Sequence, residues 1–232
     1  MDLPPRLLNV PAGTEELALR PFLVQQDVVT IDRGDFTEYN PDIKLAPVLL
    51  SHFRKQEEEQ LLTAARKVFY GENRFWMPID ELEDFMHGRV SDAQDHEPEI
   101  DIIRYVKGEI TIEIDISVWS DAIIKTGDDI DSLGSLPRDL ASNLTKFNDI
   151  QRVRLDLYDE LYNIVGLTAA IQLLFDEVQR LIHHFEAKFD IYWNYTPIDS
   201  SRTYRASLRS CWASGKLASV QEIKKIVGVQ EA

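Results

Sequence analysis

The 232-residue sequence has a single cysteine, Cys211, so no disulfide can form within the chain. A lone cysteine fits a reducing compartment. Long apolar runs are also missing, because no stretch approaches the roughly 20 residues that cross a bilayer. The N-terminus has no basic stretch followed by an apolar one, so we do not expect a secretory signal. We therefore expect a cytoplasmic or nuclear protein that does not bind membranes.

Basic residues are scarce, since 25 Lys and Arg stand against 40 Asp and Glu and give a formal net charge of −15. A chain this acidic repels phosphate backbones unless its basic residues gather in one place, so no nucleic-acid partner is expected. Residues 201–232 are an exception, with six basic residues and two acidic ones. This mildly basic tail either docks on the acidic body, stays solvated or serves as a partner-binding arm.

Sequence motifs of known chemistry are absent. The chain has no glycine-rich phosphate loop, no Gly-x-Ser-x-Gly elbow and no His-Glu-x-x-His helix. The two histidines and the acids of residues 87–99 lack the spacing of a rigid ligand pair. We therefore assign no catalytic residue and expect neither a cofactor nor a metal. One alternative is an enzyme whose site is built from loops at strand ends, with acids such as Asp115, Asp128 or Asp156.

Hydrophobic residues make up 44% of the chain, which is enough for a substantial core. Residues 1–46 hold five of the ten prolines and predict irregular structure with little helix. Pro47 begins an amphipathic helix that ends at Gly71, and a short strand at 74–77 leads into a short helix over 78–88.

Four strands are expected in all, near residues 74, 110, 152 and 189. The second is marked by alternating isoleucines from Ile110 to Ile116, and a long amphipathic helix over 161–185 precedes the fourth. Spacings of about 36 to 42 residues favour parallel pairing. We predict an α/β or α+β fold, with a small, mainly parallel sheet of about four strands and helices mostly on one face. It would resemble an irregular β-α repeat.

The expected organisation is an irregular segment at 1–46, an α/β domain at 47–200 and the basic tail at 201–232. The stretch "KVFYGENRFWMP" at 67–78 sits near the start of the middle domain. Gly71 is expected to end the helix with a positive φ, and Asn73 to satisfy freed backbone groups. The aromatic rings of residues 67–78 are expected to lie mainly in the core. The alternative is an exposed contact surface. The possible interaction residues are Tyr70 and Trp76 in this stretch and Arg202, Arg205 and Arg209 in the basic tail.

Residues 47–117 show a recognisable order of expected elements. A helix that starts at a proline is followed by the motif Phe69-Tyr70-Gly71-Glu72-Asn73, then by a strand, a short helix and the isoleucine-rich strand. This order resembles a group of uncharacterised fungal F-box-like proteins, with a degenerate F-box region in residues 1–46. The resemblance implies strand-helix units and, for well-preserved relatives, a substrate receptor that binds a Skp-type adaptor of a ubiquitin ligase.

The function expected from the sequence is a non-catalytic intracellular protein-interaction module with an acidic surface. Because opposite charges attract, its protein partner is expected to be basic. The ubiquitin-ligase receptor and the acidic enzyme remain as alternatives.

Overall fold

The computed structural model of the chain describes most of its helices and strands. The described residues are 10–31, 49–50, 52–53, 56, 58–87, 102–116, 136–159, 164–195, 203–215 and 225. The strands are β1 (Val29–Thr30), β2 (Phe75–Pro78), β3 (Glu109–Asp115), β4 (Arg152–Asp159), β5 (Phe189–Tyr195) and β6 (Tyr204–Ser207). The helices are α1 (Glu15–Leu23), α3 (Glu59–Glu72), α4 (Leu82–Met86), α6 (Leu136–Leu144), α7 (Ile164–Phe185) and α8 (Arg209–Ala213), with 3-10 turns η2 (Ile79–Glu81) and η4 (Glu186–Lys188).

The strands form a six-stranded sheet in the order β1-β2-β3-β4-β5-β6. β1 pairs with β2 and β4 with β5 in parallel, whereas β6 pairs with β5 antiparallel. The α/β fold and the four expected strands are confirmed. The expected count was too low because β1 has only two residues, too few for an alternating pattern, and because β6 lies in the segment that was expected to be a tail.

The chain divides into two compact units, which we describe separately. Unit 1 comprises residues 1–110 and 147–151, and unit 2 comprises 111–146 and 152–232. The boundaries expected at residues 46 and 200 each fall inside a unit. They do so because β1 pairs with β2 across the first boundary and β6 pairs with β5 across the second.

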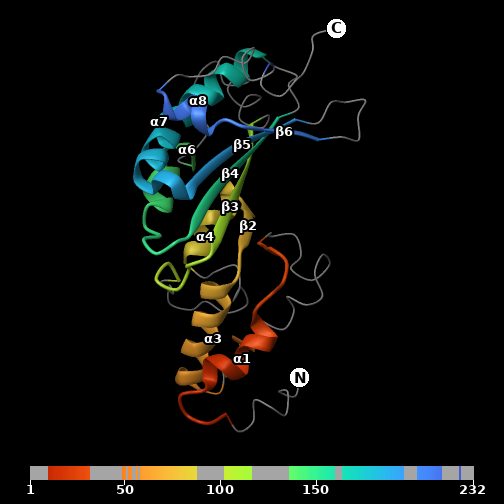
Figure 1. The fold of residues 1–232 in the computed structure, drawn as a ribbon, viewed down its shortest axis with the longest axis vertical. Coiled ribbons are helices and arrows are strands. Elements are labelled where there is room, and N and C mark those ends of the chain that lie inside the picture. The colour runs from red at the N-terminus through yellow and green to blue at the C-terminus, as the bar shows by residue number, and fades with distance from the viewer. Residues whose placement is uncertain are drawn as a thin grey trace. The chain divides into compact units, whose positions relative to one another are not determined.

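In unit 1, α1 packs along α3 (Figure 1). α1 lies in the segment that was expected to have little helix, and it contains Pro21, one of the residues behind that expectation. A proline inside a helix removes one backbone hydrogen bond. Burial of Leu19 and Leu23, both fully enclosed, compensates for this loss, so tertiary packing overrides the local signal.

The helix expected to run from Pro47 to Gly71 is interrupted. Residues 49–50 and 52–53 are helical, but α3 begins only at Glu59. The Glu58 N–H donates to the carbonyl of Phe53 at 2.9 Å. A bond over this separation is typical of a helix end, so the chain stops one helix before starting the next.

The end of α3 differs from the expectation for Gly71 and matches it for Asn73. Gly71 lies inside α3 without a positive φ; a Cβ there would lie 3.3 Å from the carbonyl oxygen of Tyr105. Its small size therefore permits close approach of another segment. The Asn73 side chain, 1% exposed, donates to the carbonyls of Phe69 (2.7 Å) and Leu23 (2.8 Å) and accepts from the Gln25 N–H at 2.7 Å. Asn73 thus joins the ends of α1 and α3.

The aromatic rings in the last turn of α3 and at the start of β2 are core, as expected, whereas Trp76 is half-buried. Phe69, Tyr70, Phe75 and Phe85 are each no more than 2% exposed. Their ring centroids lie 5.0 to 6.0 Å apart in edge or tilted arrangements, which aromatic pairs prefer.

In unit 2, β4 and β5 have one buried face and one polar face. The buried face consists of residues that are all inaccessible to solvent: Val153, Leu155, Leu157, Phe189, Ile191 and Trp193. α7 and α8 contact β5 and lie on one side of these strands, with α6 against α7 (Figure 1). Within this unit, helices on one face are confirmed. α6 is nine residues long.

Candidate functional site

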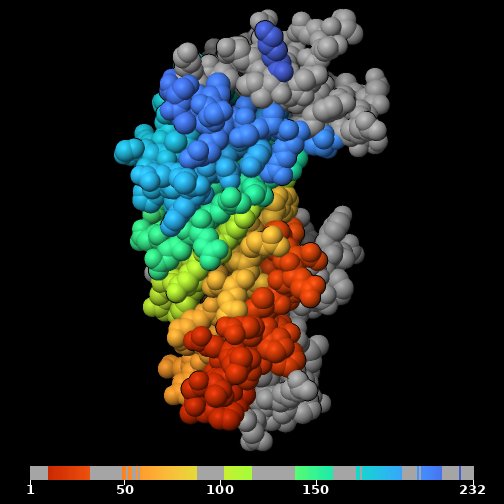
Figure 2. All heavy atoms as spheres, in the orientation of Figure 1, coloured from red at the N-terminus to blue at the C-terminus, as the bar shows by residue number. Residues whose placement is uncertain are grey.

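An open groove of about 770 Å³ runs between α1 and α3 in unit 1. Figure 2 shows the surfaces of these helices next to one another, α1 in red and α3 in orange. The residues that line the groove are Ala12, Gly13, Glu15, Glu16, Leu17, Arg20, Glu59, Gln60, Thr63, Ala64 and Lys67.

Each wall of this groove, which we call the α1–α3 groove, follows the repeat of a helix. Residues 16, 17 and 20 of α1 line one wall, and residues 60, 63, 64 and 67 of α3 line the other. Positions i, i+3, i+4 and i+7 lie on one face of a helix. Gly13, Thr63 and Ala64 are small. The groove is therefore an open space beside two packed helices, with small residues among those that line it.

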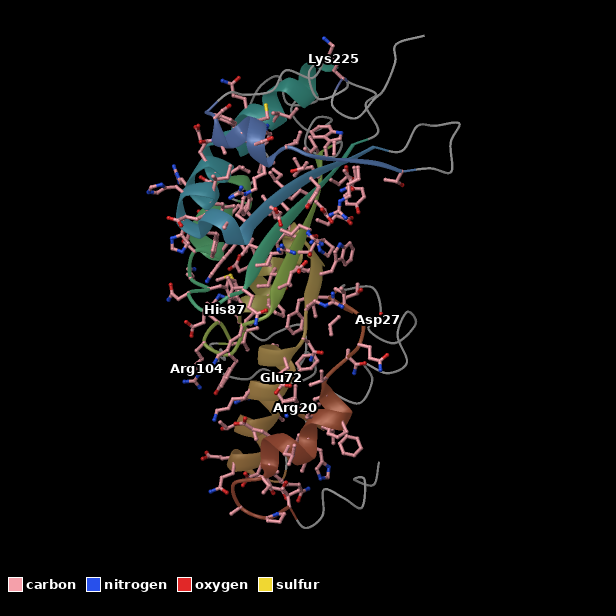
Figure 3. All side chains as sticks on the ribbon, in the orientation of Figure 1. Arg20, Asp27, Glu72, His87, Arg104 and Lys225 are labelled. Carbon is pink, nitrogen blue, oxygen red and sulfur yellow. The ribbon has the colours of Figure 1, made fainter. Side chains whose placement is uncertain are left out.

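The basic residues of the groove are already paired. The Arg20 guanidinium donates from Nε and Nη2 to both carboxylate oxygens of Glu72, each at 2.7 Å, and the two side chains lie together in Figure 3. The hydrogen bonds and the charge of Glu72 raise the pKa of Arg20. Lys67 lies 3.2 Å from a carboxylate oxygen of Glu16. Because Arg20 and Lys67 are each paired with one carboxylate, their positive charges do not balance the other acids of the groove.

Two more carboxylates, those of Glu15 and Glu59, lie at the groove. Hydrogen bonds from the backbone N–H groups of Glu15 and Gly13 lower the pKa of Glu15, so it is charged at neutral pH. Glu59 lies in the first turn of α3. The groove thus has an acidic rim.

Leu17 is the large apolar side chain at this site, and it is 67% exposed. Among the described residues, Val28 is the other large hydrophobic classed as exposed, at 37%. A single exposed leucine is common on protein surfaces. Leu17 is notable because it lines a groove that glutamate side chains also line.

A second group of polar residues lies on the polar face of the sheet in unit 2. Asp156 of β4 stands opposite Tyr192 of β5. Arg205 of β6 donates to Asp156 Oδ1 at 2.7 Å, and its guanidinium lies over the Tyr192 ring at 4.0 Å from the centroid. The Arg154 guanidinium lies over the same ring at 5.5 Å. These residues form a network that spans β4, β5 and β6.

Carboxyl groups in this network hold their protons more tightly than usual. Burial raises the pKa of Glu113, and the charges of Asp115 and Asp156 raise it further. Burial also raises the pKa of Asp156, although Arg205 and Arg154 oppose the change. Burial raises the pKa of Tyr158, and the charges of Glu113 and Asp156 raise it further. Negative charge is therefore in excess near Glu113.

The structure places the expected interaction residues differently from one another. Tyr70 is buried, and Trp76 is half-buried on β2. Arg205 bonds to Asp156, and Arg209 donates to the carbonyls of Phe189 and Glu186, each at 2.7 Å. Arg202 lies outside the described residues.

The described part of the basic tail therefore docks on its own unit. Trp212 is fully buried and packs edge-on against Phe175 at 5.6 Å between centroids. The side-chain amide of Gln179 also donates to the carbonyl of Trp212. Of the acids expected at strand ends, Asp115 and Asp156 belong to the same electrostatic group, and Asp128 lies outside the described residues.

Within the described ranges, no three His, Cys, Asp or Glu residues are grouped so that they could hold a metal ion. None of the described helices is both long enough and apolar enough to span a bilayer. Comparison of the chain with family models, curated proteins and solved structures found no match.

The sequence did not reveal the α1–α3 groove or the raised pKa of Glu113. The spacing of Glu16, Leu17 and Arg20 was a usable signal for a helix face. The nearby prolines obscured it. Glu113 was visible only as a polar position in an alternating strand, because Asp156, one of the two acids near it, belongs to another strand, β4.

Proposed function

We propose that the protein is a non-catalytic protein-interaction module that binds a basic protein partner. The observation that carries this proposal is the α1–α3 groove, which combines an acidic rim with an exposed leucine. Protein interfaces commonly join a partly apolar centre to a charged or polar rim. The net charge of −15 supports a basic partner, because complementary charge steers association.

The proposal is tested by affinity purification of the full chain followed by mass spectrometry and binding measurements with each purified partner. We expect a basic protein whose dissociation constant rises with salt, since exposed charges are screened over about 8 Å at physiological ionic strength. Failure to recover a reproducible partner, or binding that is insensitive to salt, would contradict the proposal.

An enzyme with an acidic site is a second candidate. It is favoured by one observation, the raised pKa of Glu113 and Asp156 on the same sheet face. Shifted carboxyl groups that converge are common in active sites, but they also occur in structural networks. Titration of both side chains by carbon-detected NMR, with and without a library of small molecules, separates the two cases. An enzyme should show a molecule that binds and changes these pKa values; values unchanged by every molecule would count against it.

A further inference from the structure

We infer that the α1–α3 groove binds an amphipathic α-helix of the partner, with lysine or arginine beside an apolar stripe. This inference rests on the proposed function and names the segment that would occupy the site. It draws on the shape of the walls, the hydrogen-bonding needs of an occupant and the charge of the rim.

The walls favour a helix because both are helices. Two packed helices leave a groove into which side chains of a third helix fit as ridges between ridges, with axes 8 to 10 Å apart in typical packings. The small side chains of Gly13, Thr63 and Ala64 permit such an approach. α1 has nine residues and is therefore about 13 Å long at 1.5 Å per residue. A partner helix of similar length would cover the groove.

Backbone chemistry argues against an extended occupant. A peptide strand binds well where a sheet edge offers free N–H and C=O groups. The groove is lined by α1, α3 and the two residues before α1, so it offers no strand edge. A helix satisfies its own backbone groups internally and needs only side-chain contacts.

The charges specify which helix fits. Arg20 and Lys67 are paired with acids of this chain, and the carboxylates of Glu15 and Glu59 add negative charge to the rim. A partner with cations on both flanks of an apolar stripe would complement this arrangement. Leu17, being 67% exposed, would contact the stripe and lose its exposure to water.

The test uses the full chain and a fluorescent peptide probe of fourteen or so residues, about the length of a helix that folds when supported by a surface. Leucines at helical spacing form its stripe, and lysines flank them. A peptide of the same residues in scrambled order has equal charge but no stripe. Fluorescence anisotropy should give a dissociation constant about tenfold lower for the striped peptide than for the scrambled one.

Two pairs of variants locate the binding. Leu17→Gln should weaken binding of the striped peptide about tenfold, whereas Val28→Gln, at the other exposed hydrophobic of unit 1, should change it less than about twofold. Similarly, Glu15→Gln with Glu59→Gln should weaken binding more than Asp80→Asn with Glu83→Gln. All four substituted acids belong to unit 1, and the control pair lies outside the groove.

The inference fails if the striped peptide does not bind, if both peptides bind equally, or if Leu17→Gln has no effect. Self-association of the chain that Leu17→Gln abolishes would also overturn it, because a second copy would then be the occupant. A purified basic partner that binds in a salt-dependent manner but is insensitive to Leu17→Gln would refute the helix site and leave the interaction function standing.

Discussion

Asn73→Ala is expected to destabilise unit 1 strongly. The substitution removes three hydrogen bonds made by one side chain that is 1% exposed. It leaves the N–H of Gln25 and the carbonyls of Leu23 and Phe69 without these partners. An unsatisfied buried polar group costs about 1 to 3 kcal/mol. Because water reaches the half-buried Gln25 more easily than the two carbonyls, we expect a loss of about 3 to 5 kcal/mol in the free energy of unfolding.

Urea unfolding followed by circular dichroism measures this loss, and hydrogen exchange locates it. Exchange of the Gln25 amide should accelerate most, because that N–H donates to the Asn73 oxygen. Asn143→Ala is a suitable control, since the Asn143 side chain meets only the exposed Lys146 amine among the contacts described for it. Its effect should be within about 0.5 kcal/mol, as for most surface substitutions.

Asn73→Asp separates the donor role from the acceptor role. Aspartate keeps an oxygen for the Gln25 N–H, but its carboxylate has no hydrogen to donate to the two carbonyls. It should therefore destabilise the protein at least as much as alanine at neutral pH. A loss below about 1 kcal/mol for alanine, or a stable aspartate variant, would refute the joining role of Asn73.

Three further predictions concern other parts of the molecule. Gly108→Ala should cost about 1 to 3 kcal/mol in unfolding free energy, because overpacking is destabilising and the new Cβ would lie 2.3 Å from the backbone oxygen of Asn73. Gly71→Ala, with its Cβ 3.3 Å from its nearest neighbour, should cost less, and the reverse order in urea unfolding would contradict this packing. Glu113→Gln should stabilise the protein at neutral pH but not below pH 4.5, the ordinary pKa of glutamate. The reason is that a carboxyl group whose pKa is raised by folding reduces stability as the pH rises. A difference in unfolding free energy between variant and wild type that stays constant from acid to neutral pH would rule this out. The resemblance of residues 47–117 to F-box-like proteins implies an adaptor role, which predicts co-purification with a Skp-type adaptor; absence of the adaptor from co-expressed, purified complexes would exclude that role.

The fold was predictable from sequence where the local pattern and the packing agree. The alternating isoleucines of β3 and the amphipathic pattern of α7 each identified an element of the right type. α1 was not identified, because Pro21 opposes a helix locally, whereas packing against α3 favours it. β1 and β6 depend in the same way on neighbouring strands.

The candidate sites were less predictable than the fold. Tyr70 and Arg209 looked suitable for binding because aromatic and arginine side chains are frequent in interfaces. One is buried, and the other bonds to backbone carbonyls of its own unit. Whether a side chain is available depends on contacts between distant segments, which residue type alone does not report.

The end of α3 also bears on what shared sequence can be taken to mean. Its glycine makes room for the Tyr105 carbonyl, and its asparagine ties two helix ends together. Both duties concern folding. Other chains with the letters Phe-Tyr-Gly-Glu-Asn at a helix end would thus be expected to inherit the same joint, while remaining free to diverge in the molecules they recognise.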